Sequence, residues 1–318
     1  MNNICLSIII VSWNSKGFLV KCIDSILTKK TKINYEIIVV DNASTDGSTE
    51  VLRLKYPEVV IIRNPDNFGF AKANNIGIAK ASGKYICFIN SDVEVLDNCI
   101  DIMYVFMEEN TDIGIAGPKI IGKDKFVQRS CMGFPTLWNL FSRSMALDLL
   151  FPKTKIFGSQ MMTYWPHDSI REVDVINGCF WMVRREAMLQ VGPLDETFFI
   201  YAEDIDWCRR FHESGWRVIF YPLAEAIHYG GGSSINAPMR FYIEMQKANF
   251  LYWKKYHNFI SQQLYLLLRI FHEGIRLIGH AASVIIRKKG RTISVEKIKR
   301  SWVGISWALR SMVQTLCL

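Results

Sequence analysis

The chain has 318 residues, a length that can bury one large α/β core and a smaller appendage. Half of the residues are hydrophobic and 13% are aromatic, which excludes a disordered chain. The eight cysteines lie mostly within apolar runs and form no CxxC pair, so the sequence predicts reduced, buried thiols in a cytoplasmic protein.

The net charge of +8 is unevenly distributed along the chain. Residues 251–318 contain twelve Lys and Arg and two Glu, a net charge of +10, which leaves −2 for residues 1–250. A basic tail of this kind favours anionic partners. Charge alone leaves two of them open, nucleic acid and an anionic membrane surface.

Strand-like and helical patterns alternate over the first part of the chain. Strands are predicted at 6–13, 35–41, 59–64 and 85–90, with helices at 18–27, 48–55 and 69–81. This alternation predicts βαβ units and a mostly parallel sheet flanked by helices, an α/β fold. Further strands are predicted at 114–118, 179–184 and 217–221, an aromatic-rich and partly helical insertion at 134–166, and helices from residue 238 onward.

The second predicted strand ends in carboxylates, amides and hydroxyls at 41–48. In a parallel sheet such residues reach the crevice at the carboxyl ends of the strands, where ligands bind. The carboxylate of Asp41 can accept the N3–H of a uracil or thymine ring there. Alternatively, it starts the following turn through hydrogen bonds to nearby backbone groups.

The segment 67–77 opens the third predicted helix and is rich in Gly, Ala and Asn. Small residues at a helix N-terminus favour phosphate, and Lys72 would add charge against a diphosphate. Close helix packing explains the glycines equally well.

Two more polar clusters follow further along the chain. Asn90-Ser91-Asp92 ends the fourth predicted strand, and an acidic cluster at 203–206 begins a later helix, with His228 24 residues after Asp204. In order and spacing these motifs resemble the inverting family 2 glycosyltransferases with a GT-A fold. The resemblance runs from residue 6 to about residue 234, and within the family it is closest to bacterial rhamnosyltransferases that act on lipid-linked oligosaccharides.

The resemblance implies a donor site and a metal site. Asp41 is implied at the nucleobase, with further nucleotide contacts from Ser12, Trp13, Lys72 and Ser91. Asp92 matches the acidic ligand of the family's DxD motif, from which the sequence departs at Asn90. His228 would complete a site for Mg²⁺ or Mn²⁺, which takes up charge on the departing diphosphate.

The resemblance also implies a base and an acceptor site. An inverting transfer is a single displacement that needs one base for the acceptor proton, and Asp204 stands at that position. Glu203 and Asp206 are predicted to orient the acceptor or neighbouring loops, or merely to favour the positive end of a helix. Gly178 would let the acceptor approach the backbone, and Trp181 would either stack on a sugar or belong to the core.

Residues 264–286 are apolar enough to suggest a membrane span, but polar side chains on one helical stripe interrupt them: Arg269, His272, Glu273, Arg276 and His280. An amphipathic helix in the membrane interface is predicted instead, supported by basic clusters at 287–289 and 297–300. The alternative is a helix packed on the domain. The sequence thus predicts a GT-A domain at 1–235 and a basic helical, membrane-associating region at 236–318.

The predicted function is inverting transfer of a sugar, rhamnose from dTDP-rhamnose as the first choice, to a hydroxyl of a lipid-linked oligosaccharide or polysaccharide. The alternatives are another UDP- or dTDP-sugar, a sugar-phosphate nucleotidyltransferase, and a non-catalytic binding subunit. The predicted partners are the donor, the acceptor and an anionic membrane surface on the cytoplasmic side, without nucleic acid.

Overall fold

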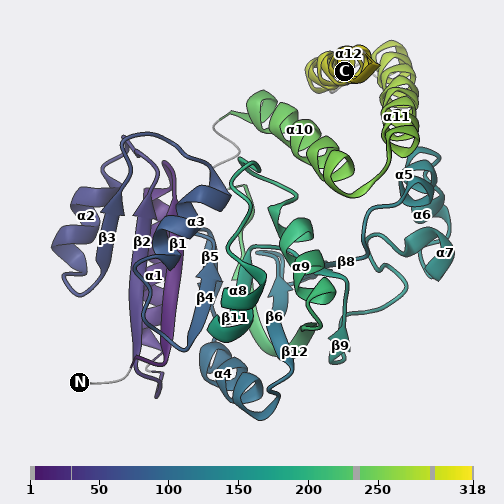
Figure 1. Cartoon of the computed structure of the whole chain (residues 1–318). Coiled ribbons are helices and arrows are strands. Elements are labelled where there is room, and N and C mark those ends of the chain that lie inside the picture. The colour runs from purple at the N-terminus through teal and green to yellow at the C-terminus, as the bar shows by residue number, and fades with distance from the viewer. Residues whose placement is uncertain (1–3, 30, 232–236, 287–290, 317–318) are drawn as a thin grey trace. The chain divides into compact units, whose positions relative to one another are not determined.

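The computed structural model describes residues 4–29, 31–231, 237–286 and 291–316, and it divides into two units (Figure 1). The first unit consists of residues 1–133 and 165–237, and the second of residues 134–164 and 238–318. The C-terminal segment of the second unit begins at residue 238, and the sequence analysis placed the start of the C-terminal region at residue 236. The second unit also takes in the insertion, which sequence reasoning had assigned to the catalytic domain.

A mixed sheet forms the centre of the first unit. Its strands run in the order β3 (Val60–Arg63), β2 (Tyr35–Asp41), β1 (Leu6–Ser12), β4 (Tyr85–Ile89), β11 (Phe180–Arg184), β6 (Ile113–Ile121), β12 (Arg217–His228) and β5 (Val93–Val95). Short strands β7 (Val127–Gln128) and β9 (Arg171–Glu172) pair with β6 and β12, and β8 (Cys131–Met132) pairs with β10 (Val175–Ile176). The strands predicted from sequence are all present.

Strand direction decides which residues meet at the sheet edge. Strands β3, β2, β1 and β4 are parallel, and Ser12 at the end of β1 lies opposite Asp41 at the end of β2. Strand β11 is antiparallel to β4, with Phe180 opposite Ile89. The start of β11 therefore lies beside the end of β4, where the Asn90 N–H donates to the Cys179 carbonyl at 2.9 Å.

Helices cover both faces of this sheet. Ile8 and Ile10 of β1 belong to the core formed with α1 (Lys16–Thr28) and α4 (Cys99–Glu109). On the opposite face, Gly77 of α3 (Phe70–Ile78) lies directly on Ile9. Burial on both faces explains the continuous apolar strands of the sequence. The remaining helices of the unit are α2 (Ser48–Lys55), α8 (Arg185–Val191) and α9 (Glu203–Glu213).

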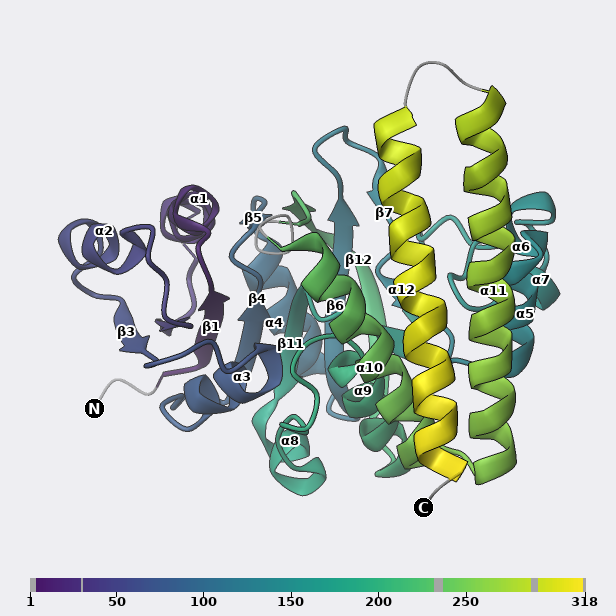
Figure 2. The same ribbon diagram turned by 90° about the horizontal axis from the view of Figure 1, so that it is seen from above.

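The second unit is helical. Helix α5 (Leu137–Ser144) of the insertion packs on α11 (Phe259–Ile286), which lies beside α12 (Arg291–Leu316) (Figure 2). Helices α6 (Leu147–Leu150), α7 (Lys155–Gly158) and α10 (Pro238–Tyr256) complete it. Among the described residues, no helix combines the length and hydropathy needed to cross a membrane.

The described cysteines carry no disulfide, as predicted, and all of them except Cys5 are buried. Cys317 lies outside the described residues.

The start of α3 is pressed against the loop that precedes α9. The Phe70 N–H donates to the Phe199 carbonyl, and Gly69 has a φ of +83°. A Cβ built on Gly69 would lie 2.2 Å from the Phe199 oxygen. This position therefore requires glycine for both its backbone conformation and its space, as the packing alternative in the sequence analysis proposed.

We expect Gly69→Ala to lower the free energy of unfolding by about 2 kcal/mol or more, because left-handed strain and a backbone clash add together. Gly215→Ala is the matched control. Gly215 also has a positive φ, +81°, but a Cβ built on it would have no atom within 4 Å, so strain alone should cost about 1 kcal/mol. Urea unfolding of both variants measures the difference. Equal losses would show that the Phe199 contact does not constrain this turn.

Candidate active site

A chain of hydroxyls joins the ends of β1 and β4. The Ser12 and Ser15 hydroxyl oxygens lie 2.9 Å apart, and Ser15 donates to the Ser91 hydroxyl at 2.9 Å. All three side chains are buried. Ser12 and Ser91, both predicted at the nucleotide, are thus held together through Ser15. Sequence reasoning missed Ser15, although it begins the first helix.

Asp41 is buried at the end of β2. Its carboxylate accepts from the Ser44 N–H at 3.3 Å and from the Thr49 hydroxyl at 3.2 Å, and the Arg63 guanidinium lies 3.7 Å away. The turn-starting role is therefore present, and the nucleobase contact remains a prediction.

The positions of Trp13 and Lys72, the other two residues predicted at the nucleotide, do not by themselves indicate a ligand contact. Trp13 is half-buried in the turn after β1, and the Lys72 ammonium lies 4.4 Å from the centre of the Phe68 ring. Their contacts with a nucleotide stay predictions.

Asp92 and His228 meet because β12 pairs with β5, with His228 opposite Val93. His228 Nε2 lies 3.3 Å from Asp92 Oδ1, and the Tyr229 N–H donates to the Asp92 carbonyl at 3.0 Å. Two predicted metal ligands, 136 positions apart in the chain, therefore face each other.

Gln128 on β7 sets the tautomer of His228. Its side-chain nitrogen donates to the His228 carbonyl at 2.8 Å, which directs its oxygen to His228 Nδ1 at 3.1 Å. An acceptor at Nδ1 favours the tautomer whose Nε2 carries a lone pair. Nε2 and the Asp92 carboxylate are then two facing acceptors, an arrangement that a divalent cation satisfies. Nothing in the sequence pattern had indicated Gln128.

The donor types fit Mn²⁺ or Mg²⁺, since both bind carboxylate oxygen and imidazole suits the former better. Within the described ranges, no group of three or more His, Cys, Asp or Glu could hold a metal. A cation held by Asp92 and His228 would take its remaining ligands from diphosphate oxygens or water.

Asp204 lies in the first turn of α9, after two residues with left-handed backbone, Tyr201 at φ +71° and Ala202 at φ +61°. Its carboxylate accepts from the N–H groups of Ile205, at 2.8 Å, and Gly178. Burial raises the pKa of Asp204 to about 6, and these N–H groups oppose the rise. A carboxylate with a pKa near neutral is suited to accept a proton.

Cys179 connects the proposed base with the proposed metal ligands. Burial, and then the charges of Asp92 and Asp204, raise the pKa of its thiol to about 12. Both carboxylates are therefore near the start of β11, beside the end of β4. The structure places Asp92 next to His228 and Asp204 next to Gly178, and the assignment of these residues to one catalytic site stays a prediction.

Glu203 is buried beside Asp204, the predicted base. Its Oε2 has no hydrogen-bond partner in the described part of the chain. Burial raises the pKa of Glu203 well above its usual range, and the charge of Asp204 adds to the shift. Burial therefore favours the neutral form of Glu203 over the charged form.

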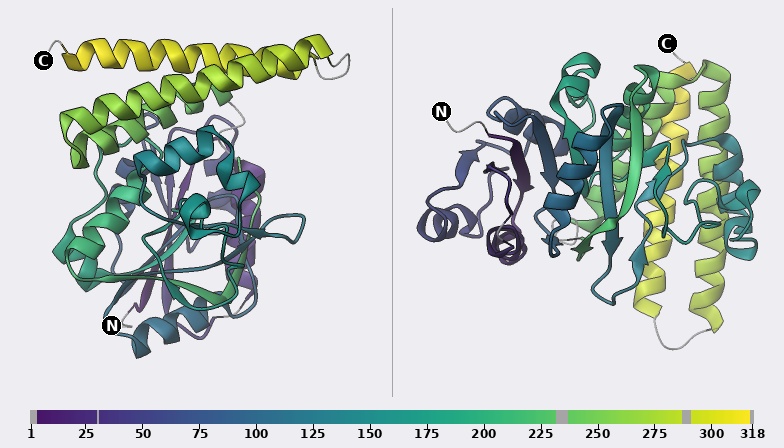
Figure 3. Two further views of the ribbon diagram at one scale, coloured as in Figure 1. Left: turned by 90° about the vertical axis from the view of Figure 1, so that its right-hand side faces the viewer. Right: turned by 90° about the horizontal axis from the view of Figure 1, so that it is seen from below.

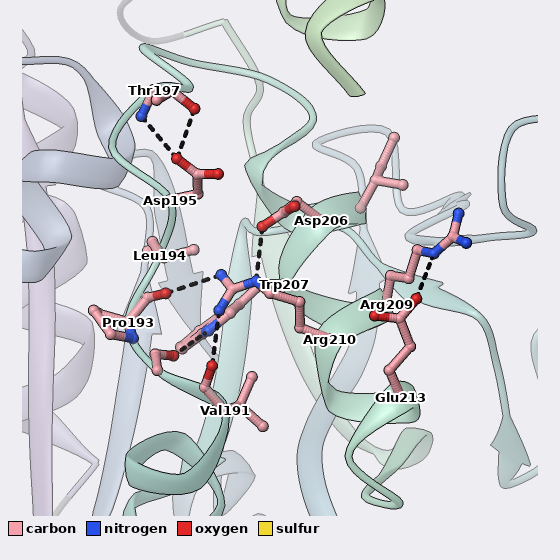
Figure 4. A network of polar contacts seen from close by, with 12 residues as sticks. Val191, Pro193, Leu194, Asp195, Thr197, Asp206, Trp207, Arg209, Arg210 and Glu213 are labelled. Atoms are coloured by element: carbon pink, nitrogen blue, oxygen red, sulfur yellow. Dashed lines mark hydrogen bonds and ion pairs between the residues drawn. The ribbon is translucent and has the colours of Figure 1, made fainter. Parts of the chain in front are cut away.

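Asp206 forms an ion pair with Arg210 on the same helix (Figure 4). Arg210 donates to the Asp206 carboxylate at 2.9 Å and to the carbonyls of Val191 and Pro193 at 3.1 and 2.9 Å. Asp206 is fully buried, so its contacts correspond to the loop-orienting role and not to acceptor binding. Sequence reasoning did not single out Arg210, four residues further along α9.

Asn75 of α3 holds the same loop from the other side. Its side chain donates to the Leu194 carbonyl at 2.8 Å and accepts from the Leu194 N–H at 3.1 Å. Together with the Phe70–Phe199 bond, this contact anchors the segment that leads into α9. The 67–77 motif thus supports the position of Asp204.

Trp181 belongs to the core. It is fully buried, its indole N–H donates to the Ile176 carbonyl at 2.9 Å, and its ring packs edge-on against Phe88. It cannot stack on an acceptor sugar from this position, because alternate side chains of β11 point to opposite faces and this one faces inward. Gly178 has no room for a side chain beside the same ring, since a Cβ would lie 3.2 Å from it.

The family model described as glycosyl transferase family 2 matches residues 7–189. The chain therefore belongs to the family 2 glycosyltransferases. It has the GT-A fold of the structures that it resembles.

One relative is an N-acetylglucosaminyl-diphospho-decaprenol L-rhamnosyltransferase of Mycobacterium tuberculosis, 26% identical over 73% of this chain and 78% of the relative. Among solved structures, a mannosyltransferase of Pyrobaculum calidifontis with GDP-Man and Mn²⁺ is 14% identical, with a TM-score of 0.57 over 95% of this chain and 87% of that one. S. aureus TarS is 13% identical, with a TM-score of 0.52 over 98% and 91%.

The pKa of Asp204 generates a prediction for the pH dependence. A base must be deprotonated to act, so the rate of sugar transfer should fall about tenfold per pH unit below the Asp204 pKa of about 6. Steady-state rates with saturating donor measure this acidic limb. A rate that does not change down to about pH 4.5 would exclude a base with a raised pKa.

Glu203→Gln is the matched control for the pH profile. Because burial raises the pKa of Glu203 and favours its neutral form, replacement by an isosteric neutral amide should leave the acidic limb in place. A limb that moves by a whole unit would show that Glu203 carries charge in the active enzyme.

Proposed function

We propose that this enzyme transfers L-rhamnose from dTDP-rhamnose, with inversion, to a hydroxyl of a lipid-linked oligosaccharide or polysaccharide. The observation that carries the chemistry is the proximity of Asp204 and Asp92 to the start of β11, one a base and the other a metal ligand. The similarity to a rhamnosyltransferase whose acceptor is diphospho-decaprenol-linked supports the choice of sugar and acceptor. Membership of family 2 argues against the nucleotidyltransferase alternative.

The reaction is a single displacement. As the acceptor oxygen attacks the anomeric carbon, Asp204 takes the hydroxyl proton, and the bond from that carbon to the diphosphate oxygen breaks with both electrons going to the diphosphate. The N–H groups of Gly178 and Ile205 keep the Asp204 carboxylate oriented. Glu203 would hydrogen-bond the acceptor through its buried carboxyl oxygen that has no partner in the described part of the chain.

Asp92 and His228 would hold Mg²⁺ or Mn²⁺. The cation, when bound, supplies positive charge against the negative charge that develops on the departing diphosphate. The Pyrobaculum mannosyltransferase is in complex with both GDP-Man and Mn²⁺, which supports a cation in the same role. Asp41 and Ser12 would bind the nucleobase of the donor, and Ser91 and Lys72 would bind its diphosphate.

The acceptor would be reached at the cytoplasmic face of the cell membrane. The basic C-terminal region, with a net charge of +10 over residues 251–318, supports attraction to an anionic surface.

The proposal is tested by incubating the purified full-length protein with a panel of dTDP-, UDP- and GDP-sugars and measuring donor binding and hydrolysis. We expect dTDP-rhamnose to bind most tightly. Asp204→Asn is the control that separates binding from chemistry. It should bind this donor normally and lose about 10²–10⁴-fold in transfer, the usual contribution of a positioned base. Preference for a UDP- or GDP-sugar would refute the choice of donor, and near-native transfer by Asp204→Asn would refute the base.

We expect Asp92→Ala and His228→Ala to share one defect, a loss of the metal-dependent part of donor binding together with most transfer activity, because each removes a ligand of the same cation. Mn²⁺ titrations monitored by donor binding measure it. His228→Asn provides a partial control, since an amide oxygen can still ligate. If exhaustive chelation leaves wild-type transfer unchanged, neither residue is a metal ligand.

A further inference from the structure

Two members of the polar stripe of α11, His272 and Glu273, face the interior of the second unit. Glu273 accepts from the Tyr242 hydroxyl of α10 at 2.9 Å and from Arg269 at 2.8 Å, and both His272 and Glu273 are buried. His272 Nδ1 lies 3.1 Å from the Ser144 hydroxyl of α5. Polar side chains that sequence reasoning expected at the water-facing surface of an interfacial helix therefore bind neighbouring helices instead.

Several large apolar side chains of α11 face the solvent, although Tyr265 and Leu266 are buried. Large exposed residues recur at intervals of four and three positions, which places them on one stripe about five turns long: Ile260, Leu264, Leu267, Phe271, Ile275 and Ile278. Helix α12 adds Val295, Trp302, Leu309 and Val313. An ordinary surface helix has the opposite arrangement, with its apolar stripe inward. An exposed apolar face of this size marks a site of association.

The insertion also exposes large apolar side chains, from a distant part of the sequence. Its α6–α7 region exposes Leu149, Leu150, Phe151 and Ile156. The insertion packs on α11 through α5, and α6 and α7 pack in turn on α5 (Figure 3). Two segments more than a hundred positions apart thus present large apolar side chains on one structural unit.

Charge identifies the partner. The second unit holds seventeen Lys and Arg and four Asp and Glu, a net charge of +13. The first unit holds twenty-one Lys and Arg and twenty-six Asp and Glu, a net charge of −5. The insertion contributes to this separation with Arg143, Lys153 and Lys155. Two copies of so basic a unit would repel each other, whereas anionic lipid headgroups attract it and the acyl region receives the apolar side chains.

We propose that the insertion and α11 together form the surface that docks this protein on an anionic bilayer, with Leu149, Leu150 and Phe151 entering the lipid beside the α11 stripe. The inference deepens the proposed function and rests on it, since it names the face through which the enzyme would meet a lipid-linked acceptor. It assigns membrane contact to residues 147–156, which lie outside the C-terminal region.

The test is co-sedimentation of the full-length protein with vesicles of phosphatidylcholine alone and of equal parts phosphatidylcholine and phosphatidylglycerol. Wild type should bind the anionic vesicles, with weaker binding at high salt. The double variant Leu149→Asp/Leu150→Asp should lose about tenfold or more in vesicle affinity for each leucine, as expected when a side chain can no longer be buried. Leu267→Asp/Phe271→Asp should behave in the same way.

The matched control is Leu189→Asp/Leu223→Asp in the first unit. These leucines are 72% and 67% exposed, against 76% and 67% for Leu149 and Leu150, so the control adds equal charge at equally exposed positions. It should bind vesicles like wild type. Because all four leucines are exposed, folding should be unaffected, which circular dichroism checks.

Three results would overturn the inference: wild type that ignores anionic vesicles, an insertion variant that binds like wild type, or a control that loses as much as the insertion variant. A wild-type dimer that the α11 variant converts to monomer in sedimentation equilibrium would instead make a second copy the occupant of this face. Donor binding is measured in parallel. Loss of vesicle binding with intact donor binding concerns this surface alone, whereas failure of every nucleotide sugar to bind would refute the proposed function and leave the surface standing.

Discussion

The antiparallel pairing of β11 with β4 is the constraint on which the site depends. In a wholly parallel sheet, every strand would bring its carboxyl end to the crevice, and the residues before β11 would lie at the opposite edge. Because β11 runs the other way, Gly178 and Cys179 come to the end of β4, next to Asp92. Asp204 then reaches the same place by accepting the Gly178 N–H. Reversing one strand thus joins the donor half of the site to the acceptor half.

Holding two carboxyl groups in this interior is energetically unfavourable, and the surrounding structure shows how they are kept. Burial raises the pKa of Glu203 and so favours its neutral form, while backbone N–H groups partly replace water around Asp204 and oppose the rise of its pKa. The left-handed residues Tyr201 and Ala202 add strain of order 1 kcal/mol each. Contacts from Arg210 and Asn75 to the preceding loop hold it in this conformation.

The second unit buries polar side chains of α11 among its aromatic and aliphatic core residues. Glu273 and His272 satisfy their polar atoms inside the unit, and burial together with the charge of Arg269 lowers the pKa of His272 so that it stays neutral there. Internal hydrogen bonding of this kind leaves the outer surface to apolar side chains. A unit that exposes large apolar side chains is suited to contact an apolar environment, and its positive charge favours an anionic one.

The sequence alone determined the strands, the carboxyl-end clusters and their order. It could do so because buried strands read as apolar runs and because Asp41, Asp92 and Asp204 each interrupt such a pattern abruptly. It also left the right alternatives open for Trp181 and for the glycines of the 67–77 segment. What it could not determine was which way side chains face. Three features arise from contacts between distant elements. They are the inward direction of Trp181 and Asp206, the contact of Gln128 with His228, and the burial of His272 and Glu273 on α11. Local periodicity fixes that a helix has two faces, but only its tertiary neighbours decide which face is covered.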